Sequence, residues 1–278
     1  MSKENPMNFV SVSAVSDREQ LDNIARIYQQ EGLNFPLTIG YQVSNKSINQ
    51  GTQNTRQPRF AEFSELDKAT RDCGFMTAVH YYTKDDTTIL VDLERIAESG
   101  VQPSLLQFNT LPPSLETLRR AREMGFRTIF KVAVSNKQSP QSGYAVWKGE
   151  GVQDVSSGQV EPLVAQVYDR KGFIDYVMFD PSHGTNLELD LDENSLAVRF
   201  GRGIVANREL DHLGLVYAGG IKPTNVRPLT KSLNHFFPNR VNIDIESGVR
   251  TDDKLDMDLV RDYLLNCGFN GVNNNGKE

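Results

Sequence analysis

Two short segments in the C-terminal third combine a strand-like run with glycines that could hold a phosphate. One runs from Leu215 to Val226 and the other from Ile243 to Val249. Glycines let backbone N–H groups approach a phosphate closely, and the start of a following helix adds its positive dipole end. Each turn alone would also fit an ordinary strand-to-helix connection. Because both occur in neighbouring units, we predict a phosphate site made by Gly219, Gly220, Ser247 and Gly248.

A carboxylate closes a third strand-like run, Asp175 to Asp180. A carboxyl group among apolar neighbours has a raised pKa and can act as a general acid. A helix cap or an ion-pair partner would use the same residue type. Asp180 is therefore a candidate acid with a structural alternative.

Other polar side chains end or follow the predicted strands. His80 carries an imidazole, which titrates near neutral pH, although a hydrogen-bonded structural histidine fits equally. His183 could orient Asp180 or simply lie in a loop. Lys131 lies in the middle of a predicted strand. A Schiff-base role for this lysine would require a desolvated position near a strand end. The histidines and carboxylates show no metal-ligand spacing and no motif indicates a nucleotide cofactor, so we predict no metal and no cofactor.

These residues sit on a repeated pattern of strand and helix. The predicted strands are residues 8–15, 35–43, 76–82, 104–109, 128–134, 174–179, 213–218 and 241–245. A helical pattern follows each strand, and such units need parallel strands and right-handed crossovers. Eight of them predict a single-domain α/β fold, a (βα)8 TIM barrel over residues 8–269. An open doubly wound sheet is the alternative, but the first turn lacks the glycines typical of it.

The chemistry of such a barrel sits at the C-terminal ends of its strands. Two insertions, 44–58 and 135–158, follow strands and open on that face, where they could form a lid. The second carries Tyr144, Trp147 and Lys148, which could close over a substrate or pack back on the barrel. We predict an N-terminal tail over 1–7 and a disordered tail over 270–278.

Composition narrows the function classes. The 278 residues carry 30 Lys and Arg against 36 Asp and Glu, a net charge of −6. A mildly acidic chain without a basic block is a poor binder of nucleic acid or of a membrane surface. No apolar run reaches the roughly 18 residues that span a bilayer, and we predict no signal peptide. Two cysteines without paired spacing indicate a reduced, cytoplasmic enzyme; a homodimer is compatible with the sequence.

The motifs resemble those of the phosphoribosylanthranilate isomerase family, the barrel enzymes of one step in tryptophan biosynthesis. Residues 218–226 and 243–249 look like the two phosphate loops of that family. Asp180 looks like its acid at the end of strand six, and residues 10–16 look like its opening strand. The resemblance is close in the C-terminal third and otherwise limited to the layout.

The resemblance implies an Amadori-type aldose–ketose isomerisation of a small phosphorylated substrate, a phosphoribosyl amine. Asp180 would protonate the ring oxygen and open the furanose to a Schiff base. A base at the end of the first strand would then remove the C2 proton, and Ser13 stands where the family has its catalytic cysteine. Arg59 could match the family's arginine for the anthranilate carboxylate, because a guanidinium fork suits a carboxylate; a solvated surface arginine is the alternative.

The departures from the family leave the base open. A serine hydroxyl is too weak an acid to replace a thiol unaided, so His80 is the substitute candidate. Asn109 stands where the family has a histidine. Glu246 lies beside a phosphate loop, where it would repel a dianion unless it points away or pairs with Arg250. A sugar-phosphate epimerase or lyase, or a non-catalytic barrel that binds a phosphorylated metabolite, is therefore the alternative function.

Overall fold

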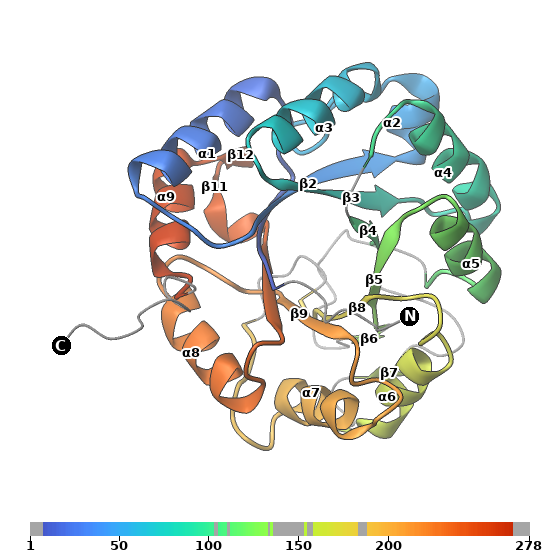
Figure 1. Ribbon diagram of the computed structural model, residues 1–278, viewed down its shortest axis with the longest axis vertical. Helices are drawn as coiled ribbons and strands as arrows, with labels where there is room; N and C mark the ends of the chain where they lie inside the picture. The colour runs from blue at the N-terminus through green and yellow to red at the C-terminus, as the bar shows by residue number, and fades with distance from the viewer. Residues whose placement is uncertain are drawn as a thin grey trace.

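Parallel strands close into a barrel in the computed structural model of the chain, with helices around it (Figure 1). The structure describes residues 8–102, 105–109, 112–132, 134–135, 153–154, 158–182 and 188–268. Around the barrel the strand order is β1-β10-β9-β8-β5-β4-β3-β2, and every neighbouring pair is parallel. The predicted (βα)8 TIM barrel is confirmed.

The bounds of the elements follow the predicted strand and helix pattern closely. The barrel strands are β1 (Val10–Ser13), β2 (Leu37–Ser44), β3 (Met76–Tyr82), β4 (Leu105–Phe108), β5 (Arg127–Lys131), β8 (Tyr176–Phe179), β9 (Gly214–Ala218) and β10 (Val241–Ile245). The helices around them are α1 (Arg18–Gln30), α3 (Phe63–Asp72), α4 (Ile89–Glu98), α5 (Leu115–Glu123), α6 (Glu161–Tyr168), α7 (Leu196–Ala206), α8 (Val226–Phe236) and α9 (Met257–Asn266). Several helices begin at a side-chain cap, as where Asp17 accepts from the backbone N–H of Gln20.

The first insertion contains a helix that the sequence pattern did not indicate. Helix α2 (Asn45–Gln50) starts at a capping box in which Ser44 and Ser47 each accept from the other's backbone N–H, and Gly51 ends it with a φ of 65°. A helix of six residues is too short to show an apolar periodicity. Only its N-terminal capping box could have predicted this helix. A 3-10 turn, η1 (Phe60–Glu62), then leads into α3.

Further short elements follow strands on the same face of the barrel. The turn η4 (Ser247–Val249) leads from β10 into an antiparallel hairpin of β11 (Arg250–Thr251) and β12 (Lys254–Leu255). At the second insertion, β6 (Val134–Ser135) pairs with β7 (Gln153–Asp154). A further 3-10 turn, η2 (Asp86–Thr88), precedes α4. The predicted tails and the loop residues Tyr144, Trp147 and Lys148 lie outside the described residues.

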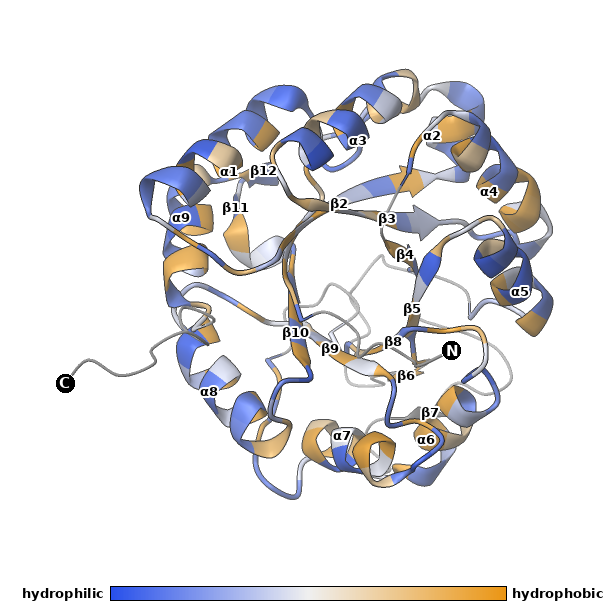
Figure 2. Cartoon of the chain, viewed as in Figure 1, coloured by the Kyte–Doolittle hydropathy of each residue, from blue (hydrophilic) through white to orange (hydrophobic). Residues whose placement is uncertain are grey.

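Strand alternation gives the barrel two kinds of buried side chain. Outward-facing residues such as Val12 and Tyr41 pack against the apolar sides of the helices, and the helices carry both hydrophilic and hydrophobic residues (Figure 2). A second apolar cluster, inside the barrel, includes Phe9, Ala78, Leu105, Ile129, Tyr176 and Val216. Two residues further along the strands, the inward positions become polar, at His80, Gln107 and Lys131. The packed layer therefore supports a polar layer at the C-terminal ends.

Candidate active site

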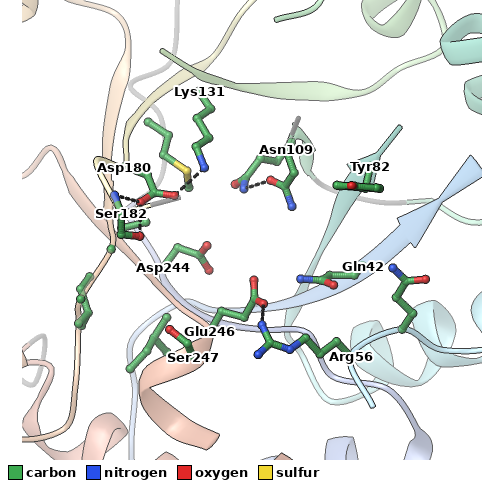
Figure 3. Close-up of a pocket in the computed structure, with 18 of the residues that line it drawn as sticks. Gln42, Arg56, Tyr82, Asn109, Lys131, Asp180, Ser182, Asp244, Glu246 and Ser247 are labelled. Carbon is green, nitrogen blue, oxygen red and sulfur yellow. Dashed lines mark hydrogen bonds and ion pairs between the residues drawn. The ribbon is translucent and has the colours of Figure 1, made fainter. Parts of the chain in front are cut away.

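A cavity of about 630 Å3 lies at the C-terminal ends of the strands (Figure 3). Its charged lining residues are Arg56, Lys131, Asp180, Asp244, Glu246 and Asp253. Its neutral polar lining is rich in amides and includes Gln42, Asn54, Gln57, Tyr82, Gln107, Asn109, Ser182 and Ser247. Carboxylates outnumber cationic side chains in this lining by four to two. The cavity therefore contains charges of both signs, beside apolar lining residues such as Met178 and Ile221.

Asp180 lies at this cavity, held by donors on both of its oxygens. The Lys131 Nζ is 2.6 Å from Asp180 Oδ2, and the two side chains are only 8% and 12% exposed. The backbone N–H and the hydroxyl of Ser182 donate to Oδ1 at 3.0 and 2.7 Å. The expectation of apolar neighbours is wrong, because strand β5 pairs with β8 and places Lys131 beside the carboxylate. Donors on both oxygens suit an ionised carboxylate, and Lys131 supplies a transferable proton at hydrogen-bond distance.

The two glycine loops lie together on one rim. Gly219 and Gly220 have φ values of 98° and 61°, a conformation that favours glycine. The Asn225 side chain fixes the first loop by accepting from the Lys222 N–H at 2.7 Å and donating to the Gly220 carbonyl at 2.9 Å. A Cβ on Gly248 would lie 1.8 Å from the Ile221 carbonyl oxygen, so the second loop packs on the first.

These loops place three of the four predicted phosphate residues at the cavity. Gly219, Gly220 and Ser247 line it, whereas Gly248 forms the contact between the loops. A Cβ on Gly219 would lie 2.8 Å from Asp180 Oδ1, so this glycine backbone and the carboxylate are adjacent. The glycines therefore bring the main chain close to the candidate acid.

Ser13 is fully buried and does not line the cavity. Its hydroxyl donates to Oδ1 of Asp244, and the Ser11 hydroxyl lies 3.2 Å from that of Ser13. Gly40 of the neighbouring strand leaves the room for this side chain, because a Cβ there would lie 2.4 Å from Ser13 Oγ. Sequence reasoning missed Asp244, although its inward register, two residues before Glu246, was a usable signal.

His80 and Asn109 occupy different depths. His80 is buried at an inward position between Gln42 and Gln107 in the strand register, and it is not among the lining residues. Asn109 does line the cavity and accepts a hydrogen bond from Gln107 Nε2 at 2.6 Å. The structure therefore gives the candidate base His80 no access to the cavity, whereas Asn109 has it.

The arginine at the cavity is Arg56 rather than the predicted Arg59. Arg59 is largely exposed, lies away from the lining, and donates to Gln53 at 2.9 Å. Arg56 pairs with Glu246 at 2.6 Å and with Asp253 at 2.5 Å. Sequence spacing could not distinguish the two arginines, because the position of each depends on the contacts that the long loop makes at the mouth of the cavity.

Glu246 is therefore partnered by Arg56, from the loop that follows β2 (Figure 3). The expected pairing with Arg250 is not what the structure shows: the Arg250 guanidinium donates to the backbone carbonyls of Asp253, at 2.7 Å, and of Ala14. The Thr55 hydroxyl and the Arg56 guanidinium donate to Asp253 and lower the pKa of that carboxyl. We call the contacts of Thr55 and Arg56 with Glu246 and Asp253 the clasp.

Neither a metal-binding cluster nor a membrane-spanning helix occurs among the described residues. Among the residues that the structure describes, no group of three or more His, Cys, Asp and Glu is arranged to hold a metal ion. His183, the predicted neighbour of Asp180, lies outside the described residues. Within the same ranges, no helix is both long and apolar enough to cross a membrane.

Comparison with known proteins supports the fold and gives no family by sequence. No protein-family model matches the chain, and no curated protein matches it. A phosphoribosylanthranilate isomerase solved with reduced 1-(o-carboxyphenylamino)-1-deoxyribulose 5-phosphate superposes with a TM-score of 0.57 at 17% identity, covering 94% of this chain and 98% of that one. The N-(5'-phosphoribosyl)anthranilate isomerase of Pyrococcus furiosus gives 0.52 at 16% identity, with coverages of 94% and 98%.

A third solved structure has a different activity in its name. The phospho-2-dehydro-3-deoxyheptonate aldolase of Thermotoga maritima gives a TM-score of 0.55 at 14% identity, covering 95% of this chain and 68% of that chain. At such identities the likeness shows a shared barrel and not a shared reaction, because one barrel architecture supports many chemistries.

Proposed function

We propose that this protein is an aldose–ketose isomerase that acts on a phosphorylated sugar amine, with the Lys131–Asp180 pair as its acid. The observation that carries the proposal is the adjacency of the glycine backbone at Gly219 and the Asp180 carboxylate. In a phosphoribosyl amine, the ring oxygen is separated from the phosphate by two carbons and one ester oxygen. A phosphate on the glycine loops therefore brings the ring oxygen toward Asp180.

The Lys131–Asp180 pair can drive the opening of the sugar ring. Lys131 lies 2.6 Å from Asp180, and its proton passes through the carboxylate to the ring oxygen. The bond from C1 to that oxygen then breaks and the nitrogen lone pair forms the C1=N bond. This product, an open-chain Schiff base, is the species from which an Amadori rearrangement proceeds.

Arg56 supports a substrate whose amine part carries a carboxylate. Its guanidinium lies at the cavity, already holds two carboxylates, and comes from the insertion after β2. A planar fork that binds Glu246 and Asp253 can also bind a substrate carboxylate such as that of anthranilate. We assign to Arg56 the role that the resemblance suggested for Arg59.

Turnover of N-(5-phosphoribosyl)anthranilate by the purified protein tests the proposal. Asp180→Asn should lower kcat by about 10²–10⁴-fold, the usual contribution of a positioned acid or base. Its affinity for the reduced product analogue should change little, since the phosphate contacts remain. Asp252→Asn, which removes an exposed charge on the same face, is the matched control. A wild-type protein without turnover, or an Asp180→Asn variant as fast as wild type, would refute the assignment.

A lyase that works through Lys131 is the second candidate. The observation in its favour is a buried amine at a strand end that faces the cavity beside a carboxylate. Such a lysine would form an imine with a ketone or aldehyde substrate, and borohydride would reduce that imine to a stable adduct. Adducts on Lys131 with simple phosphorylated ketones, together with no isomerase turnover, would favour the lyase.

The same proposal implies a small phosphorylated metabolite as the ligand and a cytoplasmic site of action. Cys73 and Cys267 are both free thiols, as is usual in reducing compartments. Microscopy of a fluorescent fusion checks the location, and growth of a tryptophan auxotroph that lacks the isomerase checks the pathway. A fusion found outside the cytoplasm contradicts the first inference, and failed complementation by an expressed, folded protein contradicts the second.

A further inference from the structure

Of the described residues, Asp244 is one of two buried carboxylates that line the cavity, the other being Asp180. It lies at the end of β10, is 9% exposed, and lines the cavity. The Ser13 hydroxyl donates to its Oδ1. Within the described residues, Oδ2 accepts no hydrogen bond, and it is not shut away from the cavity. Figure 3 shows the side chain projecting into the middle of the cavity.

The other candidates for a base are less well placed. The Ser13 hydroxyl lies behind Asp244 and is a poor base by itself. His80 does not line the cavity. Asp180 is committed to Lys131 and Ser182, while Glu246 is paired with Arg56. Among the described residues, Asp244 is therefore the lining carboxylate that has no ion pair and keeps an oxygen for the substrate.

We propose that Asp244 is the catalytic base of the isomerisation and that Ser13 is its positioning residue. This inference rests on the proposed function and names the second proton-transfer group of the same site. The Ser13 hydroxyl orients the Asp244 carboxylate through Oδ1. The second oxygen, Oδ2, is then free to accept a proton. In this way the chain obtains a base without a thiol at the end of β1.

The proton transfers balance over the whole reaction. Asp244 takes the proton from C2 of the Schiff base, the C2–H electron pair becomes the C1=C2 bond, and the C1=N pair returns to nitrogen. The enolamine then becomes the ketone as Asp244 gives the proton to C1. The C2 hydroxyl returns a proton through Asp180 to Lys131, which had supplied the proton that the ring oxygen received. Each side chain therefore ends in the state in which it began.

Four variants of the full chain test the inference with N-(5-phosphoribosyl)anthranilate as the substrate. Asp244→Asn keeps the shape of the side chain and an acceptor for Ser13, and it should lower kcat by about 10²–10⁴-fold. Its affinity for the reduced product analogue should stay within about threefold of wild type, because catalysis rather than binding is removed. Asp252→Asn is the control for loss of a charge on this face.

Ser13→Ala separates a positioning role from a structural one. It should lower kcat by about tenfold with KM unchanged, and Ser13→Cys alone should restore kcat, because a thiol still donates to Asp244. A merely structural serine would alter the thermal midpoint without this split between kcat and KM.

The outcomes separate this inference from the proposed function. If the wild type turns over and the folded Asp244→Asn variant keeps its kcat, Asp244 is not the base although the isomerase assignment stands. If Asp244→Asn does not fold, an unchanged kcat in Ser13→Ala overturns the inference. A wild type without turnover overturns the proposed function itself, and the base with it.

Discussion

The two walls of the cavity are built differently. On the wall of β8, β9 and β10, the functional residues directly follow their strands, as Asp180 and Gly219 do. On the wall that follows β2, the chain between β2 and α3 first forms α2, residues 51–59 and η1. Of the predicted residues that the structure describes, Asp180, Gly219, Gly220 and Ser247 of the first wall reach the lining, whereas Arg59 of the second does not. A side chain at a strand end is placed by the register of the sheet, but one in a long loop is placed by what the loop touches.

The clasp is where the two walls meet. Arg56 from the loop wall holds Glu246 and Asp253, which follow β10 on the strand wall. One wall is therefore fixed by backbone packing and the other by side-chain ion pairs. We therefore expect substitutions on the strand wall to lower the unfolding free energy and substitutions on the loop wall to lower ligand affinity.

The largest effect should come from the strand wall, at the contact between its two loops. Gly248→Ala would place a Cβ 1.8 Å from the Ile221 carbonyl oxygen, and one of the two backbones must move. We expect unfolding free energy to fall by about 3 kcal/mol, the upper range for overpacking. Chemical denaturation measures it, with Gly172→Ala as the control, because a Cβ there meets nothing within 4 Å. Equal stability of the two variants would show that the loops are not locked together.

The loop wall should respond in ligand affinity. Arg56→Ala leaves Glu246 without its partner beside the phosphate loop, so an anionic ligand meets an uncompensated carboxylate. We expect affinity for the reduced product analogue to fall by about tenfold, consistent with loss of a charged hydrogen bond. Calorimetric titration measures it, and Arg59→Ala serves as the matched control because its ion pair is exposed and lies off the cavity. A loss in Arg59→Ala equal to that in Arg56→Ala would contradict the placement.

The smallest effect should be that of pH on the clasp. Hydrogen bonds from Thr55 and Arg56 lower the pKa of Asp253 from its ordinary 3.8. A lowered pKa means that the contribution to stability is complete at neutral pH and is lost only as pH falls through the lowered value. The difference in thermal midpoint between wild type and Arg56→Ala should therefore stay constant from about pH 8 to 5 and shrink below about 3.8. A difference that changes between pH 8 and 5 would mean that another group controls the clasp.

The barrel was predictable because its signals are local and repeated. Capped helices, short turns and β-rich runs recur in the sequence, and the first turn lacks the glycines typical of the alternative, an open doubly wound sheet. Helix α2 escaped prediction because six residues with a single apolar side chain, Ile48, show no apolar period. The fold therefore followed from pattern alone, apart from a loop helix that depends on a serine cap.

The site was predictable only in part, for physical reasons. Asp180 and Gly219 directly follow the ends of their strands and Ser247 comes two residues after its strand, so position along the chain gave their position in space. The ion pair of Lys131 with Asp180 depends on the pairing of β5 with β8, which composition does not encode. Asp244 was missed because its importance comes from a residue 231 positions away.

That separation has a consequence for how the molecule is made. Synthesis delivers a chain from its N-terminus, and β1 finds one of its two strand partners, β10, only after every other barrel strand has been made. Until then β1 presents an unpaired edge, and the Ser13 hydroxyl has no Asp244 to meet. The barrel depends on contacts distant in sequence, so closure should be a late and slow step of folding. A nascent chain therefore has no partly working site: the pocket arises together with the closing of the ring.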